Sequence, residues 1–386
     1  MAGRQPLGRR GVRLLLLSRS LELGGAERQL CLLAAGLKAR GHQVDVACFY
    51  AQGPLMAELA SAGVRVHPLG KSGRWDVLGA ILALRRLAAR LRPQALYSFL
   101  DTPNLLAALT RPLRPGLKVA WGVRASDMDL TRYGRFAALT ARLLPHLAWG
   151  ADVIIVNSQA GAEVAAARGL PAGKLVVIPN GIDTERFAPD PAAGAPVRAA
   201  WGVDPDETLV GLVGRIDPMK DHANFLRAMA RVRERLPGLR LVCVGGGEAG
   251  LAELKALAAS LGLADRLTWA GPRQDMPAVM NALDLCVLAS AYGEGFPNVL
   301  GEAMACARPV ATTRVGDAAW VVGRPELTAP PKDPAALAAA CLGLLARPAA
   351  ERQALGLALR RRVIEEFSLA AMVQASERVL CALIRA

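Results

Sequence analysis

The chain has 386 residues, of which 53% are hydrophobic, and its 47 Lys and Arg against 33 Asp and Glu give a formal net charge of +14. This length exceeds one ordinary domain, so the composition predicts two compact units, each with its own core. The charge is uneven, because residues 1–185 hold 24 basic and 12 acidic side chains, whereas residues 186–386 hold 23 and 21. The first half therefore favours an anionic partner, unless its arginines are simply scattered through an alanine-rich chain.

The seven cysteines are widely spaced and form no C-x-x-C pair, which is typical of buried thiols in a reducing compartment. After the basic start, the apolar run Leu14–Leu17 is shorter than a secretory hydrophobic region. The longest uncharged stretch rich in alanine and leucine, Pro334–Ala346, is too short to cross a bilayer. The sequence therefore predicts a soluble, cytoplasmic chain that can bind peripherally to the inner face of the cell membrane.

Short apolar runs alternate with helix-length segments along the first half, a pattern that predicts βα units and a parallel sheet. Helices are expected at 25–40, where Gly41 is a candidate C-cap, and at 76–91, where Arg92 and Pro93 end the helix. The expected strands are Val12–Leu17, Val44–Phe49, Val64–His67, Ala95–Phe99, Lys118–Trp121, Val153–Val156 and Lys174–Ile178.

A stretch rich in Pro, Gly and Asp, residues 179–196, is the expected linker, and from about Pro334 the pattern is helical only. We therefore expect an α/β fold with two doubly wound domains, 1–185 and 186–366, followed by a terminal helix at 367–386. In such sheets ligands bind beyond the carboxyl ends of the strands, so the cleft between the domains is the expected site. The expected strands of the second half are Leu209–Val213, Leu239–Val244, Arg266–Trp269, Leu285–Leu288 and Pro309–Thr312.

Several other classes of enzyme have little support. Gly70-Lys-Ser72 lacks the earlier glycine of a phosphate-binding loop, and no serine has the G-x-S-x-G spacing of a hydrolase. The four histidines are far apart, which disfavours a metal centre or a histidine-based triad. The pattern G-x-G-x-x-G occurs at Gly245–Gly250, but the next strand does not end in the acid that would hold a nicotinamide ribose. A glycine-rich turn facing the cleft is the favoured interpretation.

Two motifs suit an anionic ligand. In Leu23-Gly-Gly-Ala-Glu-Arg28, Gly24 and Gly25 open a helix after the first strand, and they either let the backbone approach an anion or make a tight turn. In Gly214-Arg-Ile-Asp-Pro-Met-Lys220, Arg215 and Lys220 lie between a strand end and a helix start. Such a pair can clamp a diphosphate from two directions, with a solvated loop as the alternative.

The stretch Glu294-Gly-Phe-Pro-Asn-Val-Leu-Gly-Glu302 places two carboxylates on either side of a helix start at Pro297. Free backbone N–H groups at that start suit a phosphate without a metal ion. Glu294 and Glu302 can each accept hydrogen bonds from vicinal hydroxyls, and a diphosphate between two polyols is a nucleotide sugar. An acid–base pair would need both carboxyls around one reacting bond, so the two acids are better interpreted as binding groups at opposite ends of one donor.

Taken in order, LGGAERQL, VIPNGID, GRIDPMKD and EGFPNVLGE resemble the motifs of the family-four retaining glycosyltransferases, group 1 glycosyl transferases with the GT-B fold. The resemblance covers nearly the whole chain. It implies two Rossmann-like domains facing a central cleft, with C-terminal helices that cross back to the first domain. It also implies a hexosyltransferase that moves a sugar, with retention, from a nucleotide diphosphate sugar to a glycan or lipid-linked glycan in cell-surface polysaccharide synthesis.

By this resemblance the reaction needs no metal ion and no cofactor beyond the nucleotide diphosphate sugar as co-substrate. Arg215 and Lys220 would bind the donor diphosphate and offset charge on the leaving group, and Glu294 would bind the transferred sugar. Glu302 would hold the ribose hydroxyls. The remaining donor-binding residues implied by the resemblance are Gly24, Gly25, Phe296, Pro297, Asn298 and Val299.

One departure from the family pattern lies in the first half. Many relatives have a histidine where this chain reads Trp121-Gly-Val-Arg124-Ala-Ser-Asp127. Arg124 cannot act as a general base at ordinary pH, but same-face attack, in which the leaving phosphate takes the acceptor proton, requires none. Arg124 and Asp127 are therefore expected in the acceptor region, with a surface Arg–Asp pair as the alternative.

The basic first half then fits an acceptor held at an anionic membrane surface. Nucleic acid is not an expected partner, because the basic segments are not built around a motif that reads RNA or DNA. Two other functions stay open at this stage. One is a nucleotide-sugar epimerase or hydrolase of the same fold, and the other is a non-catalytic protein that binds sugars or membranes.

Overall fold

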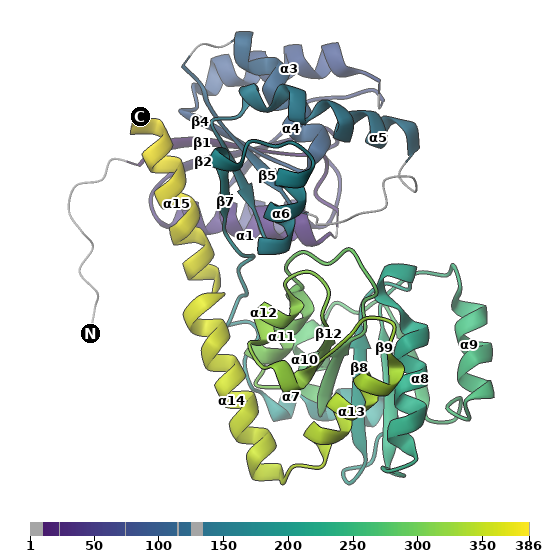
Figure 1. Ribbon diagram of the computed structural model, residues 1–386. Helices are drawn as coiled ribbons and strands as arrows, with labels where there is room; N and C mark the ends of the chain where they lie inside the picture. The colour runs from purple at the N-terminus through teal and green to yellow at the C-terminus, as the bar shows by residue number, and fades with distance from the viewer. Residues whose placement is uncertain (1–10, 23, 74, 114–115, 125–133, 386) are drawn as a thin grey trace, which may run out of the picture.

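The computed structural model describes residues 11–22, 24–73, 75–113, 116–124 and 134–385, which fold around two parallel sheets (Figure 1). The first sheet has seven strands in the order β3-β2-β1-β4-β5-β6-β7, and the second has six in the order β10-β9-β8-β11-β12-β13. In both sheets the chain reverses its direction of growth once, between β1 and β4 and between β8 and β11. These two switch points are where doubly wound sheets bind ligands.

The first sheet is covered on both faces, so its strands are almost continuously apolar. The predicted helix at 25–40 is α1, which ends at Ala39, and Gly41 follows with a φ of +89°, a left-handed conformation that glycine adopts without strain. The elements are β1 (Arg13–Ser18), α1 (Gly25–Ala39), β2 (Gln43–Cys48), α2 (Leu55–Ser61), β3 (Arg65–Pro68), α3 (Val77–Leu91), β4 (Ala95–Phe99), α4 (Asp101–Thr110), η1 (Arg111–Leu113), β5 (Lys118–Val123), α5 (Gly134–Leu143), η3 (Pro145–Gly150), β6 (Val153–Val156), α6 (Gln159–Ala167), η4 (Ala172–Lys174) and β7 (Leu175–Val177).

The second sheet forms a separate core with its own helices. All twelve strand segments predicted from the sequence form strands, and the two-residue edge strand β13 is the one that the pattern missed among the described residues. The elements are α7 (Pro191–Ala200), β8 (Thr208–Val213), η5 (Pro218–Lys220), α8 (His222–Arg233), β9 (Leu239–Val244), α9 (Leu251–Ser260), β10 (Leu267–Gly271), α10 (Met276–Ala282), β11 (Leu285–Leu288), α11 (Asn298–Ala305), β12 (Val310–Thr313), α12 (Ala318–Val322), η6 (Pro325–Leu327), β13 (Thr328–Ala329), α13 (Pro334–Leu345), α14 (Ala349–Glu366) and α15 (Leu369–Arg385).

The predicted linker, 179–196, is only partly irregular. Its last residues begin α7, because Asp190 caps the helix by accepting a hydrogen bond from the amide of Ala193, and Pro191 occupies the first helical position. Proline and aspartate in that stretch are therefore helix-start signals as well as loop formers.

The two C-terminal helices join the domains. α14 packs against α11 of the second domain, whereas α15 packs against α1 of the first, as the yellow helices in Figure 1 show. The crossing point is pinned by Ile182, whose amide donates to the carbonyl of Phe367 at 2.8 Å and whose carbonyl accepts from the amide of Leu369 at 2.8 Å. Glu377 of α15 then pairs with Arg40 and His42. The linker and the crossing helices thus contact each other at one place.

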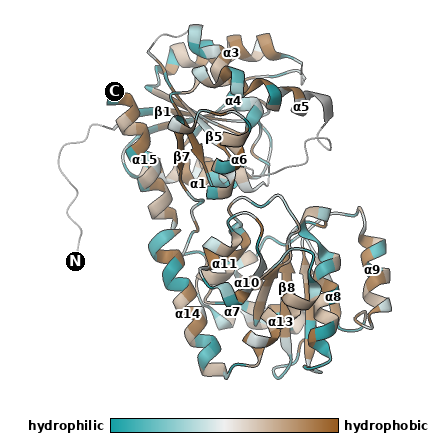
Figure 2. Ribbon diagram, in the orientation of Figure 1, coloured by the Kyte–Doolittle hydropathy of each residue, from teal (hydrophilic) through white to brown (hydrophobic). Residues whose placement is uncertain are grey.

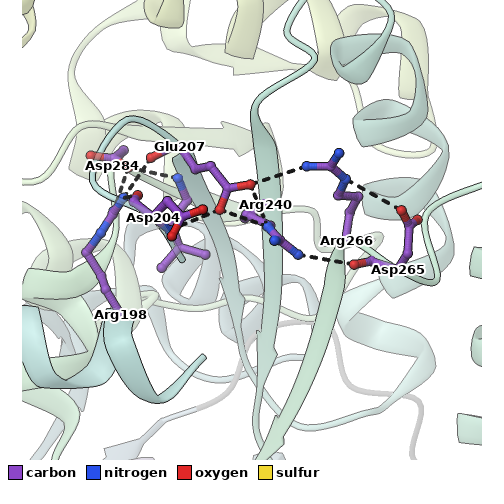
Figure 3. A network of polar contacts seen from close by, with 8 residues as sticks. Arg198, Asp204, Glu207, Arg240, Asp265, Arg266 and Asp284 are labelled. Carbon is purple, nitrogen blue, oxygen red and sulfur yellow. Dashed lines mark hydrogen bonds and ion pairs between the residues drawn. The ribbon is translucent and has the colours of Figure 1, made fainter. Parts of the chain in front are cut away.

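A charged network lies at the amino ends of the strands of the second sheet (Figure 3). Glu207, which precedes β8, accepts hydrogen bonds from Arg240 at 2.8 Å and from Arg266 at 3.2 Å. A backbone hydrogen bond from Asp204, followed by the two arginines, holds the pKa of Glu207 below its ordinary value. These charges pair with one another at the amino ends of the strands. A ligand would bind at the opposite, carboxyl edge of the sheet.

None of the helices within the described residues combines the length and the hydropathy that a membrane span requires.

Candidate active site

The predicted donor residues follow strands at the two switch points. Gly24 and Gly25 come after β1, Arg215 comes after β8, and Glu294 comes after β11. The carboxyl edges of the two sheets face each other in Figure 1, and residues of the two halves of the chain are in hydrogen-bond contact. The fold therefore brings residues that are up to 270 positions apart in sequence to one cleft.

The loop that carries Arg215 packs against the glycine turn 245–247. A Cβ on Gly245 would meet the carbonyl oxygen of Gly214 at 2.0 Å, and a Cβ on Gly247 would meet the carbonyl oxygen of Ile216 at 2.7 Å. The amide of Ile216 also donates to the carbonyl of Gly246 at 2.8 Å. Gly245 and Gly247 therefore let the turn pack against the backbone on either side of Arg215, because a side chain at either position would push the two loops apart.

The Arg215 side chain is exposed, and within the described part of the chain it has no hydrogen-bond or ion-pair partner. Lys220, by contrast, is partly buried and donates to Glu294 Oε1 at 2.5 Å. Ser290 Oγ donates to the same oxygen, and Glu294 is only 6% exposed. Of the three residues predicted to be catalytic, two therefore contact each other and the third projects into solvent.

The N-termini of α1 and α11 meet in the cleft. A Cβ on Gly25 would lie 3.6 Å from Nδ2 of Asn298, the first residue of α11. Pro297 precedes α11, and Phe296 is buried with its ring 5.2 Å from that of Phe367. Each helix start presents unpaired N–H groups and the positive end of its dipole. We call the space between these two helix starts the slot. Each dipole end favours an anion there, while Glu27 lies in the first turn of α1 and Lys220 is paired with Glu294.

Glu302 lies one turn into α11, on the side of the helix that faces α1. Burial raises its pKa from 4.5 to about 7, and the positive charges of Arg28 on α1 and Arg186 oppose that shift. The carboxyl is therefore about half protonated at neutral pH in the free protein. A ligand that hydrogen-bonds to the carboxylate would shift it to the charged form.

Among the described residues, Arg124 contacts groups of the first domain and of the linker. It reaches inward, donates to the hydroxyl of Tyr97 at 2.7 Å and to Asn180 Oδ1 at 3.3 Å, and stacks on the ring of Phe99 at 4.3 Å. Asn180 Nδ2 in turn donates to Asn298 Oδ1 at 2.8 Å. The residue predicted to lie near the acceptor is thus connected through Asn180 to the start of α11. Asp127, its predicted neighbour, lies outside the described residues.

The sequence did not predict roles for Gln29 and Asn180, although Gln29 lies in the motif LGGAERQL and Asn180 in VIPNGID. Gln29 of α1 makes two hydrogen bonds of 2.9 Å to the backbone of Gly181, one as donor and one as acceptor. The linker is therefore hydrogen-bonded to Gln29 of α1 and, through its own Asn180, to Asn298 of α11. Nothing in the sequence pattern indicates these contacts, because each joins residues more than 100 positions apart.

Asp317 links the two domains at a second point. Its carboxylate accepts hydrogen bonds from the amides of Gln159 at 2.7 Å and Ala160 at 2.9 Å, at the N-terminus of α6. The side chain is 4% exposed, and burial raises its pKa although the two amides oppose the shift. An aspartate of the second domain thus caps a helix of the first.

We expect Asp317→Ala to lower the free energy of unfolding by about 1–2 kcal/mol, because it removes a buried carboxylate that caps two partly buried amides at the start of α6. Asp206→Ala, at an exposed position of the same domain, is the control and should change stability by less than about 0.5 kcal/mol. Chemical denaturation of both variants measures the difference. Equal stability of the two variants would show that the Asp317 contact contributes nothing.

A pocket of about 380 Å³ opens beside the Arg215 loop. It lies at the carboxyl ends of β8, β9 and β10, and the glycine turn 245–247 forms its floor. Trp269, Pro272 and His222 contribute its walls, and Lys255 lies at its edge. The loop that carries Arg215 and Lys220 therefore also lines this pocket, through Gly214 and Ile216.

Two facing Rossmann-like domains with this strand order, and a cleft lined by both, define the GT-B architecture. Two family models match the chain: "Glycosyltransferase Family 4" at residues 23–186 and "Glycosyl transferases group 1" at residues 207–347. The chain therefore belongs to these glycosyltransferases, and the predicted family is confirmed. The first match includes the glycine turn of α1, and the second includes Arg215, Lys220, Glu294 and Glu302.

Among curated proteins, the chain is 40% identical over 173 residues to a D-inositol 3-phosphate glycosyltransferase of Mycobacterium sp. strain KMS. That match covers 43% of this chain and 38% of the relative's length. Among solved structures, Anabaena HepE in complex with UDP superimposes with a TM-score of 0.82 at 22% identity and covers 96% of this chain and 100% of its own. Sucrose-phosphate synthase of Thermosynechococcus elongatus gives 0.79 at 24% identity, covering 96% and 99%. These similarities confirm the predicted GT-B fold.

Proposed function

We propose that this protein transfers a sugar, with retention of anomeric configuration, from a nucleotide diphosphate sugar to a glycan or lipid-linked glycan during cell-surface polysaccharide synthesis. The observation that carries the proposal is the meeting of the N-termini of α1 and α11, with Lys220 paired to Glu294 in the loop that leads into α11. Family membership supports the class of reaction. The UDP bound to Anabaena HepE, and the UDP-glucose in a second HepE structure, support a nucleotide sugar as the donor.

The slot fits a diphosphate for electrostatic reasons. Free amides at the starts of α1 and α11 can donate to phosphate oxygens, and Arg215 adds a guanidinium that has no competing partner among the described side chains. These fixed positive groups can stabilise the charge that develops as the sugar–phosphate bond breaks, which is the role that a metal ion has in other transferases. We therefore propose a metal-independent reaction without a further cofactor.

The two acids then bind the two polyols of the donor. Glu302 would accept hydrogen bonds from the ribose, and Glu294, held by Lys220 and Ser290, would contact the transferred sugar. Glu294 therefore both orients Lys220 and contacts the sugar. The nucleotide base would occupy the pocket next to Trp269, because the loop that carries Arg215 and Lys220 also lines that pocket.

In the proposed step, the acceptor hydroxyl attacks the anomeric carbon on the face that the diphosphate leaves. The new carbon–oxygen bond forms as the bond to the phosphate oxygen breaks, and the acceptor proton passes to that phosphate oxygen. No side chain of the protein acts as a base, in agreement with an arginine, Arg124, near the acceptor side. Arg124 would instead orient the acceptor and, through Asn180, the start of α11.

The test is to incubate the protein with a panel of nucleotide sugars and with lipid-linked and free glycan acceptors, in buffer containing EDTA. We expect one donor to be consumed, a nucleoside diphosphate to be released in step with a glycosylated acceptor, and NMR to show the donor's anomeric configuration in the product. Release of free sugar or of an epimer without an acceptor would favour the epimerase or hydrolase alternative. Complete dependence on added Mg²⁺ would refute the metal-independent mechanism.

An acceptor at a membrane requires a surface that can bind lipid, and side chains at α3 would suit one. Trp75, just before α3, and Leu78 and Leu82 on α3 are 69%, 77% and 45% exposed, and exposed arginines follow on the helix. Figure 2 shows both hydrophobic and hydrophilic stretches along α3. Apolar side chains beside Arg85, Arg86 and Arg90 suit the interface of an anionic bilayer, where each basic residue contributes about 1 kcal/mol. We propose that this face of the first domain holds the protein peripherally on the inner side of the cell membrane.

We expect the double variant Leu78→Glu/Leu82→Glu to bind vesicles containing anionic lipid at least about tenfold more weakly than the wild type. The two acids remove apolar area that the bilayer would bury, and their charges are repelled by the anionic lipid. Co-sedimentation with vesicles measures this. Ile364→Glu, an exposed apolar residue on α14 of the other domain, is the matched control and should bind normally. Equal loss in both variants, or no loss in either, would rule out the α3 face.

A further inference from the structure

We propose that His222 contacts the nucleotide base and contributes to the choice of base, an inference that rests on the proposed nucleotide sugar donor. His222 is the first residue of α8 and is 3% exposed, yet it lies in the wall of the pocket beside Trp269. Both ring nitrogens are buried without a hydrogen-bond partner among the described residues. A buried, unpaired imidazole at the wall of a pocket is a group that a ligand can satisfy.

Leaving these nitrogens unpaired has a cost. A buried polar group without a partner destabilises the folded state, and an apolar residue would avoid that penalty. The ring is held by packing alone, since its centroid lies 6.5 Å from that of the Trp269 indole, with 27° between the ring planes. Because no hydrogen bond fixes the imidazole, rotation about its Cβ–Cγ bond can turn a nitrogen toward a base in the pocket without breaking any polar contact.

The ring is neutral in this environment. Burial, together with the charge of Lys220, lowers the pKa of His222 to about 4. A neutral imidazole offers one donor and one acceptor, which matches the mixed donor and acceptor edge of a nucleobase. An imidazolium at the same place would instead attract phosphate and would not distinguish bases.

The chain geometry places His222 on the base side of the nucleotide. Lys220 ends η5 and donates to Glu294, whereas His222 begins α8 two residues later and lines the pocket beside Trp269. Between them Asp221 adopts φ +45°, a left-handed conformation, and caps α8 by accepting from the amide of Asn224 at 3.0 Å. This reversal lets one short segment contact the diphosphate and the base of the same molecule.

The experiment is titration calorimetry of the full chain in EDTA with UDP, GDP, ADP and inorganic pyrophosphate. For His222→Phe we expect affinity for the preferred nucleoside diphosphate to fall about tenfold, toward that of the other two, with pyrophosphate affinity unchanged. The same variant should melt at the same or a higher temperature, because it removes two unpaired nitrogens while filling the site beside Trp269. His222→Gln, whose amide retains a donor and an acceptor, should bind closer to the wild type than His222→Phe.

Each outcome is decisive. If the His222→Phe and wild-type proteins bind and rank the three nucleotides alike, His222 does not contact the base. An equal fall in affinity for pyrophosphate would mean that the substitution disturbs the diphosphate loop, and would also overturn the inference. If the wild type binds none of the three nucleotides, the proposed function itself fails. His146→Phe, at an exposed histidine of the first domain, is the control and should leave every affinity unchanged.

Discussion

Replacing Arg215 by alanine should lower turnover by about 10²–10³-fold and leave the fold unchanged. The guanidinium stands at the carboxyl end of β8, at the switch point of the second sheet, and removal of one fixed group that stabilises developing negative charge typically has an effect of this size. Since the side chain is exposed and contacts no partner among the described residues, its loss should change the free energy of unfolding by less than about 0.5 kcal/mol. Steady-state kinetics and thermal melting measure the two quantities.

Arg231→Ala is the matched control, because Arg231 is an exposed arginine in the last turn of the neighbouring helix α8. It should retain wild-type turnover. An Arg215→Ala protein with normal turnover would refute the diphosphate role of this residue. A large fall in stability in the same variant would show that Arg215 has a structural role instead.

Lys220 is a less informative target, although it contacts the same site. Its ammonium neutralises Glu294, which is 6% exposed, and removing one partner of a buried ion pair costs about 3–5 kcal/mol. A Lys220→Ala protein would therefore lose stability and turnover together. Substitution of the exposed Arg215 tests turnover separately from stability, whereas substitution of the partly buried Lys220 changes both.

Replacing Glu302 by glutamine should have opposite effects on stability and on donor binding. The folded-state pKa of about 7 lies above the ordinary value of 4.5, so the stability that the protonated form provides is fully present below pH 4.5 and is lost as the pH rises through 7. At pH 8 the charged carboxylate therefore costs up to about 3 kcal/mol, which the neutral amide avoids. We expect Glu302→Gln to melt at a higher temperature than the wild type at pH 8 and at the same temperature near pH 4.5.

Donor binding should change in the other direction. A carboxylate can accept hydrogen bonds from both ribose hydroxyls, whereas an amide offers one acceptor oxygen, so Glu302→Gln should weaken binding of the nucleotide sugar about tenfold or more at pH 8. In the wild type, affinity should fall about tenfold between pH 8 and pH 6 as Glu302 takes up a proton, and the variant should show no such dependence. A nucleotide sugar is the suitable probe, because its diphosphate has no terminal phosphate to titrate.

Calorimetry at both pH values, with melting curves of the free proteins, tests this pair of effects. Unchanged affinity in Glu302→Gln would remove Glu302 from the ribose site. A variant less stable than the wild type at pH 8 would contradict the burial that raises the pKa of Glu302.

Much of the fold was predictable, because its signals are local. Buried strands such as Val153–Val156 read as uninterrupted apolar runs, and helix ends carry recognisable residues such as Gly41. Asp190 and Pro191 show the limit of that approach. The same residues signal a loop and a helix start, and only the packing of α7 against α10 decides between them.

The site was predictable at the level of motifs and not of contacts. The spacing of Glu294 and Glu302 around a helix start predicted their position at α11, but not that Lys220 and Ser290 both bind Glu294. The roles assigned to the donor residues stay predictions. The Arg124–Asn180–Asn298 chain and the Asp317 contact with α6 could not be predicted, since they depend on how the two domains approach each other. Local sequence carries no information on that approach.

The central claim is that a diphosphate lies between the starts of α1 and α11. A crystal structure of the protein with its preferred nucleoside diphosphate tests it most directly. We predict phosphate oxygens within hydrogen-bond distance of the backbone amides near Gly25 and Asn298 and of the Arg215 guanidinium, with the ribose against Glu302 and the base beside Trp269. A nucleotide bound elsewhere, or one whose diphosphate contacts only one of the two helix starts and neither Arg215 nor Lys220, would contradict the account.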